Sequence, residues 1–178
     1  MPTHLPILFP LKDYISNINS CRACPLVDRK IIYRSNEKLP ISIVFVGEAP
    51  GMVEYIQSKP FIGPAGDKLN YLIQECVPPH LGYIIINSIS CTPWKDKNTK
   101  NKIRTPTTSE AKFCSSRHVI PLIETLKPKY VIALGKIAHS CLKKITHLHV
   151  LHPSAILQST HEELETKRFI LTVREYLK

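Results

Sequence analysis

The residues whose types and spacing could do chemistry gather in residues 44–66, VFVGEAPGMVEYIQSKPFIGPAG. An apolar run ends there in Gly47, Glu48 and Ala49, and Phe61 follows a proline. Glycines let a backbone come close to a ligand, Glu48 supplies a carboxylate, and the Phe61 ring could form a stacking wall or simply pack in the core. We expect a ligand pocket at the carboxyl edge of a sheet, where open α/β folds bind ligands.

Two more polar residues accompany apolar runs. Asn87 lies within YIIINSIS, where its amide could read a base edge with one acceptor and two donors or be satisfied by nearby backbone. His152 follows a later run, and it could donate to a developing oxyanion or cap the strand, which the residues alone favour. Candidate phosphate contacts are Ser154 and the N-terminal amides of a helix that Gly66 is predicted to open.

Six cysteines are present, at positions 21, 24, 76, 91, 114 and 141. Cys21 and Cys24 form a CxxC pair, and Cys91 and Cys114 flank a basic segment, 92–107, that we expect to be an exposed loop. If that loop folds back, four thiolates converge on one centre, either a tetrahedral zinc or a [4Fe–4S] cluster. The spacing does not separate these two, and Cys91 and Cys114 could also be ordinary buried cysteines. Two others are interpreted as core residues: Cys76 and Cys141.

The elements that must position these residues are indicated by four short apolar runs, at 41–46, 83–89, 130–134 and 148–151. Nearly continuous apolar runs of this length are typical of parallel strands that are buried on both faces. Helical patterns occupy 65–76, 108–126, 136–144 and 162–177. Strands that alternate with helices predict one α/β domain over residues 1–178, with a central four-stranded parallel sheet flanked by helices.

Charge and composition narrow the class of partner. The formal net charge is +10, from 24 Lys and Arg against 14 Asp and Glu, which favours nucleic acid first and an anionic membrane surface second. No apolar run approaches the roughly 20 residues that span a bilayer. The first residues show no basic region or cleavage site of an export signal. We therefore expect a cytoplasmic protein, no membrane partner, and reduced thiols rather than disulfides.

Taken in order, the motifs resemble those of family 4 uracil-DNA glycosylases, the iron–sulfur type. The family patterns GEAPGxxED and GxPFxGxAG are matched by GEAPGMVEY and SKPFIGPAG. The remaining matches are Cys21, Cys24, Leu26 and Arg29; Asn87 with Cys91; Arg104, Pro106, Glu110 and Cys114; the strand–helix pattern of 127–138; and HPSAIL at 152–157. Agreement thus extends from about residue 21 to 157, and several motifs in the right order are more specific than any one.

The resemblance implies a three-layer glycosylase fold and a monofunctional enzyme that hydrolyses the bond between uracil and deoxyribose, which starts base excision repair. It also implies that the partner is uracil-containing DNA, single- or double-stranded, that the protein acts as a monomer, and that a structural [4Fe–4S] cluster is held by Cys21, Cys24, Cys91 and Cys114. Zinc is the alternative.

The same resemblance assigns roles within the pocket. Phe61 would stack on a uracil flipped out of the helix, Asn87 would bond its N3 and O4 edge, and backbone at 47–49 would line the pocket. His152 would stabilise charge on uracil O2. Glu48 would favour the cationic sugar and help place the water. Because Ala49 stands where related glycosylases have Asp, we expect transition-state electrostatics to outweigh base catalysis.

Four positions depart from the family pattern: Tyr55 replaces Asp, Ser58 replaces Gly, Pro64 replaces a common Arg, and Gln158 replaces an Arg. The segment between Cys91 and Cys114 is also longer and more basic. These departures leave one alternative, a catalytically weak or inactive uracil- or DNA-binding protein with the same fold and cluster. An unrelated phosphate-handling α/β enzyme with zinc is disfavoured, because the chain has no GxGxxG or GKS/T loop.

Overall fold

The computed structural model describes residues 9–26, 28, 30–31 and 33–178. Arg29 of the cysteine motif lies outside the described residues, as does the segment 1–8 on which the export prediction rests. Among the helices that the structure describes, none is long and apolar enough to cross a membrane.

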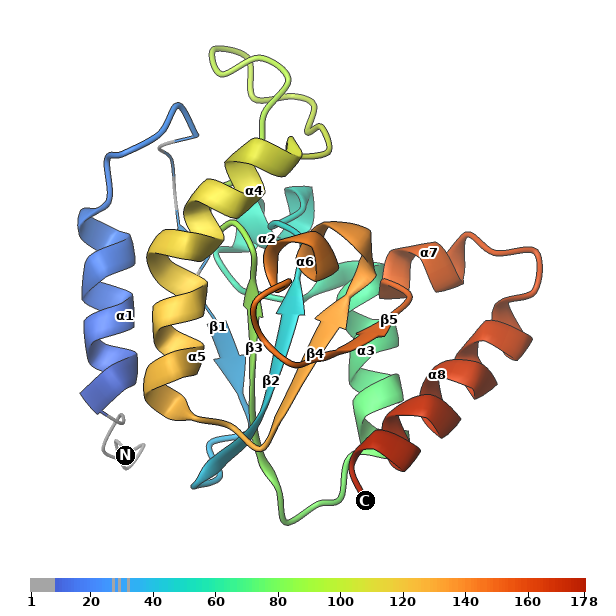
Figure 1. Ribbon diagram of the computed structural model, residues 1–178. Coiled ribbons are helices and arrows are strands. Elements are labelled where there is room, and N and C mark those ends of the chain that lie inside the picture. Colours follow the sequence, from blue (N-terminus) through green and yellow to red (C-terminus); the bar gives the residue numbers. More distant parts are fainter. Residues whose placement is uncertain (1–8, 27, 29, 32) are drawn as a thin grey trace, which may run out of the picture.

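The centre of the molecule is a five-stranded sheet in the order β1-β3-β2-β4-β5 (Figure 1). Its strands are β1 (Tyr33–Ser35), β2 (Ile41–Gly47), β3 (Gly82–Asn87), β4 (Tyr130–Leu134) and β5 (Leu148–Val150). β2 to β5 run parallel, which confirms the four predicted strands within two residues at each end. β1 was not predicted. It pairs antiparallel with β3 at the edge, and its three half-buried residues form no apolar run.

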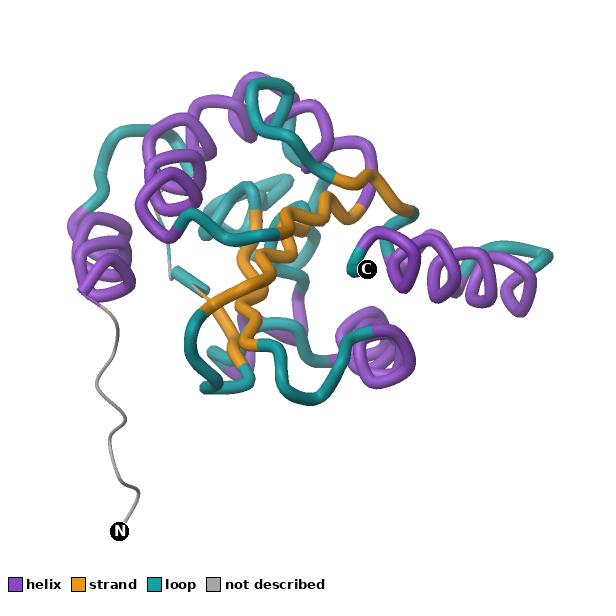
Figure 2. The backbone as a smooth tube through the Cα atoms, turned by 60° about the horizontal axis from the view of Figure 1, so that its bottom comes forward, coloured by secondary structure: helices purple, strands orange, loops and turns teal. Residues whose placement is uncertain are grey.

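Helices cover both faces of the sheet, so that the strands lie between two helical layers (Figures 1 and 2). The helices are α1 (Phe9–Ser20), α2 (Met52–Gln57), α3 (Gly63–Cys76), α4 (Thr108–Cys114), α5 (Ile120–Leu126), α6 (Gly135–Cys141), α7 (Pro153–Leu157) and α8 (Glu162–Tyr176). α1 and α5 pack on one face and α3 and α8 on the other. This is the predicted α/β architecture, and α1, α2 and α7 are additional helices.

The continuous apolar character of β2 follows from burial of both faces. Ile43 and Phe45 belong to the core cluster under α3 and α8, whereas Val44 and Val46 belong to the cluster under α1 and α5. All four side chains are fully buried. Successive side chains of a strand point to opposite faces, so each face of the sheet receives two of them and residues 43–46 are apolar on both faces.

The predicted helix over 108–126 is interrupted in its middle. Thr107 and Glu110 form a capping box that starts α4, and a π-helical segment, Ser115–Val119, joins α4 to α5. The Ser115 hydroxyl is buried and donates to the Ser88 carbonyl oxygen at 3.2 Å, which ties this turn to the end of β3. π-helical turns are rare and often occur at functional sites; this one directly follows Cys114.

Candidate functional site

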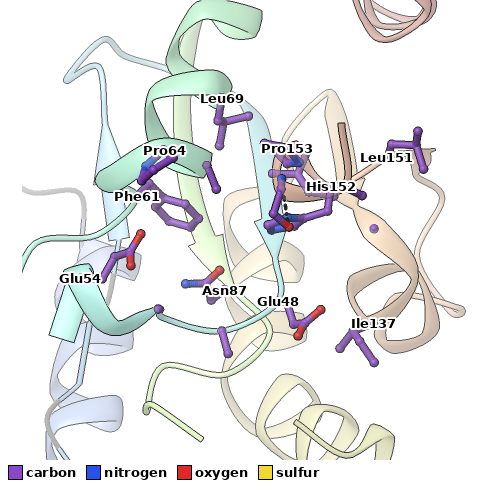
Figure 3. A pocket seen from close by; sticks show the side chains of 18 of the residues that line it. Glu48, Glu54, Phe61, Pro64, Leu69, Asn87, Ile137, Leu151, His152 and Pro153 are labelled. Carbon is purple, nitrogen blue, oxygen red and sulfur yellow. Dashed lines mark hydrogen bonds between the residues drawn. The ribbon is translucent and has the colours of Figure 1, made fainter. Parts of the chain in front are cut away.

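A pocket opens at the carboxyl edge of the sheet, where the parallel strands end (Figure 3). Seven residues that the sequence singled out line it: Glu48, Ala49, Phe61, Gly66, Asn87, His152 and Ser154. In Figure 3 the Phe61 ring lies beside the Asn87 amide, with His152 across the pocket from them. The residues predicted to form one ligand site are therefore brought together from segments that are far apart in the sequence.

Gly47, which was predicted to line the pocket, is not among the described lining residues and instead lies against the two candidate recognition side chains, Asn87 and Phe61. It is the last residue of β2 and pairs with Asn87 of β3. A Cβ atom at Gly47 would lie 2.5 Å from Asn87 Oδ1 and 3.2 Å from Phe61 Cε1. The first distance is shorter than any real contact of that kind, so only glycine allows Asn87 and Phe61 to occupy these positions.

The amide of Asn87 is held ready for a ligand. The residue is 4% exposed, and within the described part of the chain its side chain forms no hydrogen bond. Local backbone therefore does not satisfy it. The amide atoms are not among the fully buried unpaired groups of the described residues and Asn87 lines the pocket, so the amide can be satisfied there by water or by a ligand that supplies both an acceptor and a donor.

Phe61 has a strained backbone that its neighbours hold in place. Its φ of 52° lies in the left-handed region, which costs a non-glycine residue on the order of 1–3 kcal/mol. Arg34 of β1 donates from Nη1 to the Phe61 carbonyl oxygen at 3.1 Å, and from Nη2 to Asn70 Oδ1 of α3. The ring belongs to the core cluster on one side and lines the pocket on the other, so core packing and a stacking wall are compatible.

Gly66 supports the same turn. It is the fourth residue of α3 and is buried, and a Cβ there would lie 2.3 Å from the Phe61 carbonyl carbon and oxygen. The structure thus explains this glycine by its close contact with the Phe61 backbone. Contact of Gly66 and Ser154 with a DNA phosphate stays a prediction.

His152 has a fixed tautomer. It is the N-cap of α7, and its Nδ1 accepts from the Ser154 backbone amide at 3.2 Å and lies 2.8 Å from Ser154 Oγ. Burial lowers the pKa of His152 to about 4, so the ring is neutral near pH 7. Because Nδ1 accepts, the single ring proton resides on Nε2. The cap and the donor role are therefore compatible, since they use opposite nitrogens.

Gly135 explains why His152 can approach the end of β4. This glycine has a φ of 85°, and a Cβ there would meet His152 Cβ at 3.0 Å. Sequence reasoning matched the Leu-Gly pair of the 127–138 pattern without assigning it to the pocket. Gly135 and the adjacent Lys136 both line it.

Two carboxylates line the pocket. Burial raises the pKa of Glu48, and it also raises the pKa of Glu54, where the backbone amides of Gly51 and Ile62 oppose the rise. Glu54 was missed, although GEAPGMVE contains it in register with the family motif. Through these amides its carboxylate joins α2 to the residue after Phe61.

The four predicted cysteine ligands surround a second, small cavity with Leu26 and Ile89. Burial raises the pKa of Cys91 and raises that of Cys114 to about 12, and the nearby thiols add to both shifts. Over the described residues, no group of three or more His, Cys, Asp or Glu side chains is positioned to hold a metal ion. The thiols are thus neighbours around one cavity without meeting at a point.

The remaining two cysteines are buried, as predicted. Cys76 belongs to the core under α3 and α8, and Cys141 packs beside the cysteine cavity.

The segment 92–107 is more ordered than an exposed loop. Trp94 and Ile103 form an antiparallel bridge, the Lys95 amide donates to the Lys102 carbonyl oxygen at 2.8 Å, and the Arg104 amide donates to the Pro93 carbonyl oxygen at 2.9 Å. We call residues 93–104 the basic hairpin; it is the yellow-green excursion above α4 in Figure 1. It reaches the pocket, because Ile103 is one of the lining residues.

Tyr55 of α2 contacts the basic hairpin and is not among the described residues that line the pocket. Its ring meets the Trp94 ring edge-on, with centroids 4.7 Å apart. Lys100 Nζ donates to the Tyr55 hydroxyl at 3.2 Å and to Asp28 Oδ1 at 3.0 Å, and Trp94 Nε1 donates to Asp28 Oδ2 at 2.5 Å. The residue that departs from the family's Asp is therefore not among the described lining residues and contacts the hairpin instead.

Comparison with known proteins agrees with this geometry. The model of the Uracil DNA glycosylase superfamily matches residues 36–178. The chain is 33% identical over 131 residues to the type-4 uracil-DNA glycosylase of Archaeoglobus fulgidus, which covers 72% of this chain and 61% of that protein. It is 30% identical over 174 residues to the type-4 uracil-DNA glycosylase of Thermotoga maritima, which covers 86% of this chain and 85% of that protein.

A third relative, from Pyrobaculum aerophilum, is 31% identical over 129 residues, with 62% of its length covered. The chain therefore spans about three fifths of the Archaeoglobus and Pyrobaculum relatives and most of the Thermotoga one. On the superfamily match and these identities, the chain belongs to the uracil DNA glycosylase superfamily and, within it, to the type-4 family.

Proposed function

We propose that this protein is a monofunctional uracil-DNA glycosylase that starts base excision repair by hydrolysing the N-glycosidic bond of uracil in single- or double-stranded DNA. It would act as a monomer in the cytoplasm. The observation that carries the proposal is the Asn87 amide, placed next to the Phe61 ring and across the pocket from a neutral His152.

Base recognition follows from the groups that Asn87 and Phe61 offer. The amide donates to uracil O4 and accepts from N3–H, whereas cytosine presents a donor and an acceptor in the reverse order and pairs only if the amide is turned over. Phe61 stacks on the face of the flipped base. Flipping costs a few kcal/mol, and these contacts, made only with the extruded base, offset it.

Bond cleavage requires a site for negative charge on the leaving base. As the bond from C1′ to N1 breaks, its electron pair moves onto uracil and the charge collects at O2. His152 donates from Nε2 to that oxygen. Because Ser154 occupies Nδ1 and the ring is neutral, the donor is preorganised and no proton must first be acquired.

The sugar becomes cationic as the base departs, and a water then adds to C1′ and loses a proton, which is taken up by the uracil anion directly or through solvent. Glu48 favours this cation when ionised and helps to place the water. Burial raises its pKa, so the carboxylate is poorly solvated and its charge acts strongly over short distances. Ala49, which also lines the pocket, offers no base, so stabilisation of charge supplies most of the rate.

The cysteine cavity fits a [4Fe–4S] cluster held by Cys21, Cys24, Cys91 and Cys114. Four cysteines supply the usual donors, and thiols spread around a cavity suit one cysteine per iron better than four ligands on one zinc ion. Bound iron would supply the positive charge that lets these buried thiols ionise. The cluster's role is structural, because its cavity and the base pocket have no lining residue in common.

The test of the proposed activity uses oligonucleotides with one uracil, incubated with protein and then treated with alkali to cleave abasic sites. Wild-type protein should give strand scission on single- and double-stranded substrates. Asn87→Ala should lose it without a change in melting temperature, while Asn19→Ala, at an exposed position on α1, should retain it. Absence of scission by folded wild-type protein on both substrates would refute the proposal.

The cofactor is tested separately by absorbance and by iron and zinc analysis of the purified protein. We expect broad visible absorbance and about four irons per chain. Cys114→Ser should lose the absorbance and melt at a lower temperature, whereas Cys76→Ser, in the core on the other face of the sheet, should keep the absorbance. A colourless wild-type protein with one zinc per chain would overturn the cluster assignment.

A further inference from the structure

The basic hairpin places one apolar side chain at the mouth of the pocket. Ile103 lines the pocket and is 36% exposed, and it is the apolar residue of the hairpin that lies at the pocket. Its position is fixed by the bridge to Trp94, itself buried at 5% exposure. From this place an apolar side chain can contact both a ligand in the pocket and a molecule bound at the pocket mouth.

The hairpin is fastened to the body of the protein at both ends. On its first strand, Trp94 is held by Asp28 and by the edge contact with Tyr55. On its second strand, Arg104 forms two hydrogen bonds with the Glu110 carboxylate, at 2.7 and 2.8 Å. These contacts join the hairpin to α2, to α4 and to the segment that follows the CxxC pair, so Ile103 is presented on a supported element.

The charges of the hairpin indicate what lies against it. Lys100 and Arg104 are used internally by Asp28 and Glu110. Three further lysines, Lys95, Lys97 and Lys102, are exposed and are available to phosphates. An exposed apolar side chain beside exposed cations suits a polyanion with an apolar interior, which is the chemistry of a DNA duplex opened at one base.

We propose that the basic hairpin is the element that grips duplex DNA, with Ile103 inserted against the bases that flank the extruded uracil and the three lysines on the phosphates around it. Tyr55 supports the hairpin and acts as a positioning residue. The proposal rests on the proposed glycosylase function and deepens it, because it assigns the cost of opening a duplex to a segment outside the uracil-binding residues. A single strand has no stack to hold open, so it needs Ile103 less.

The test compares kcat/KM on a U·A duplex with kcat/KM on the same uracil strand alone. Ile103→Ala should lower the duplex-to-single-strand ratio about tenfold. Without the Ile103 side chain between the bases, part of the unstacking cost of a few kcal/mol is no longer offset. Tyr55→Ala should lower the ratio in the same direction and by less. Leu171→Ala, at an exposed position on α8, is the matched control and should leave the ratio unchanged.

A second measurement separates this proposal from the glycosylase activity itself. Fluorescence anisotropy would record binding to a duplex with a stable abasic-site analogue and to the corresponding single strand. Ile103→Ala should weaken the duplex complex more than the single-strand complex, whether or not the wild-type protein cleaves uracil. Equal losses on the two DNA forms in this assay, or no loss, would overturn the hairpin proposal, while inactive wild-type protein alone would count only against the glycosylase.

Discussion

The base pocket and the basic hairpin are held in different ways. In the pocket, Gly47, Gly66 and Gly135 let backbone and side chains approach more closely than any Cβ allows. In the hairpin, the contacts are made by side chains: Trp94 and Lys100 with Asp28, and Arg104 with Glu110. The pocket therefore depends on positions where an added methyl group would clash. The hairpin depends on separate side-chain contacts, and one of these can be lost while the others remain.

This difference teaches where the chain tolerates change. The departures at Tyr55 and in the length of 92–107 fall on the side-chain-held region, and Tyr55 has become part of its support. Ser58, which replaces a family glycine, takes the left-handed C-cap of α2 with a φ of 54°. Pro64 falls in the first turn of α3, where proline is well accommodated. Pro64 also lines the pocket, so the pocket accepts a departure where the backbone suits proline.

The sharpest test of the pocket is His152→Asn. Asparagine keeps an oxygen that can accept from the Ser154 amide and is a preferred N-cap residue, but it removes the Nε2 donor. We expect a loss of about 10²–10³ in the single-turnover rate of excision, the scale of one oxyanion donor, with DNA affinity preserved. A variant with nearly normal rate would show that His152 serves only as a cap.

The same variant sharpens the comparison through pH. Burial holds the pKa of His152 at about 4, below its usual 6.5, so the unfolded chain binds more protons at this residue between those values. Above pH 6.5 His152 therefore does not lower the free energy of unfolding. As the pH falls from 6.5 towards 4, the free energy of unfolding decreases by up to roughly 3 kcal/mol, because protons bind to the unfolded chain. Denaturant unfolding at pH 7.5 and 4.5 should show a smaller loss for His152→Asn than for wild type.

Gly47→Ala tests whether steric limits define the pocket. The new methyl group must displace Asn87 and Phe61, and a misplacement near 1 Å costs about 10² in rate. Gly51→Ala is the graded comparison: Gly51 also lines the pocket, but its Cβ would meet only the Glu54 side chain, at 2.6 Å, and neither Asn87 nor Phe61. Single-turnover rates should fall much further for the first variant. Equal rates for the two variants would show that the pocket tolerates an added methyl group at Gly47.

Glu110→Gln tests the attachment of the hairpin. The Arg104 guanidinium holds the pKa of Glu110 at about 2, so the stability it contributes is present above pH 4.5 and is lost as pH falls towards 2. Glutamine can still serve the capping box, and we expect a loss of about 1 kcal/mol at pH 7 that shrinks by pH 3. Glu163→Gln, in an exposed pair with Lys167, should show no measurable change.

The smallest effect is expected from the exposed lysines. Replacing Lys95, Lys97 and Lys102 by glutamine should weaken DNA binding severalfold and flatten the dependence of log Kd on log salt by up to about three units of slope, one per phosphate contact. Anisotropy titrations between low and moderate salt measure this slope. An unchanged slope would show that the hairpin cations do not face the DNA backbone.

Much of this arrangement could be predicted, because it depends on local patterns. The parallel strands could be predicted because neighbouring residues such as Val44 and Phe45, which face opposite sides of the sheet, are both apolar. The ends of parallel strands then bring Gly47, Asn87 and His152 to the same edge of the sheet. The family resemblance placed the four cysteines together, and the structure finds them around one cavity.

The rest depends on contacts that no local pattern encodes. β1 is paired through its backbone to β3, so Arg34 could not be seen to support Phe61. The hairpin is ordered by Asp28, which is 66 residues from Trp94 in the chain. Gly135 and Glu54 were matched to motifs, but their contacts with His152 and with the residues around Phe61 become apparent only once the strands are side by side.

The strand order β1-β3-β2-β4-β5 also determines when each strand can find its partner during synthesis. β2 pairs with β3 on one side and with β4 on the other, and β4 then receives β5. A ribosome adds about 5–20 residues per second, so Leu134, the last residue of β4, follows Cys114 by roughly 1–4 s. During that interval all four cysteines have been made, yet the apolar edge of β2 still lacks its second partner. Slow or interrupted translation would leave that edge open to pairing with other chains for longer.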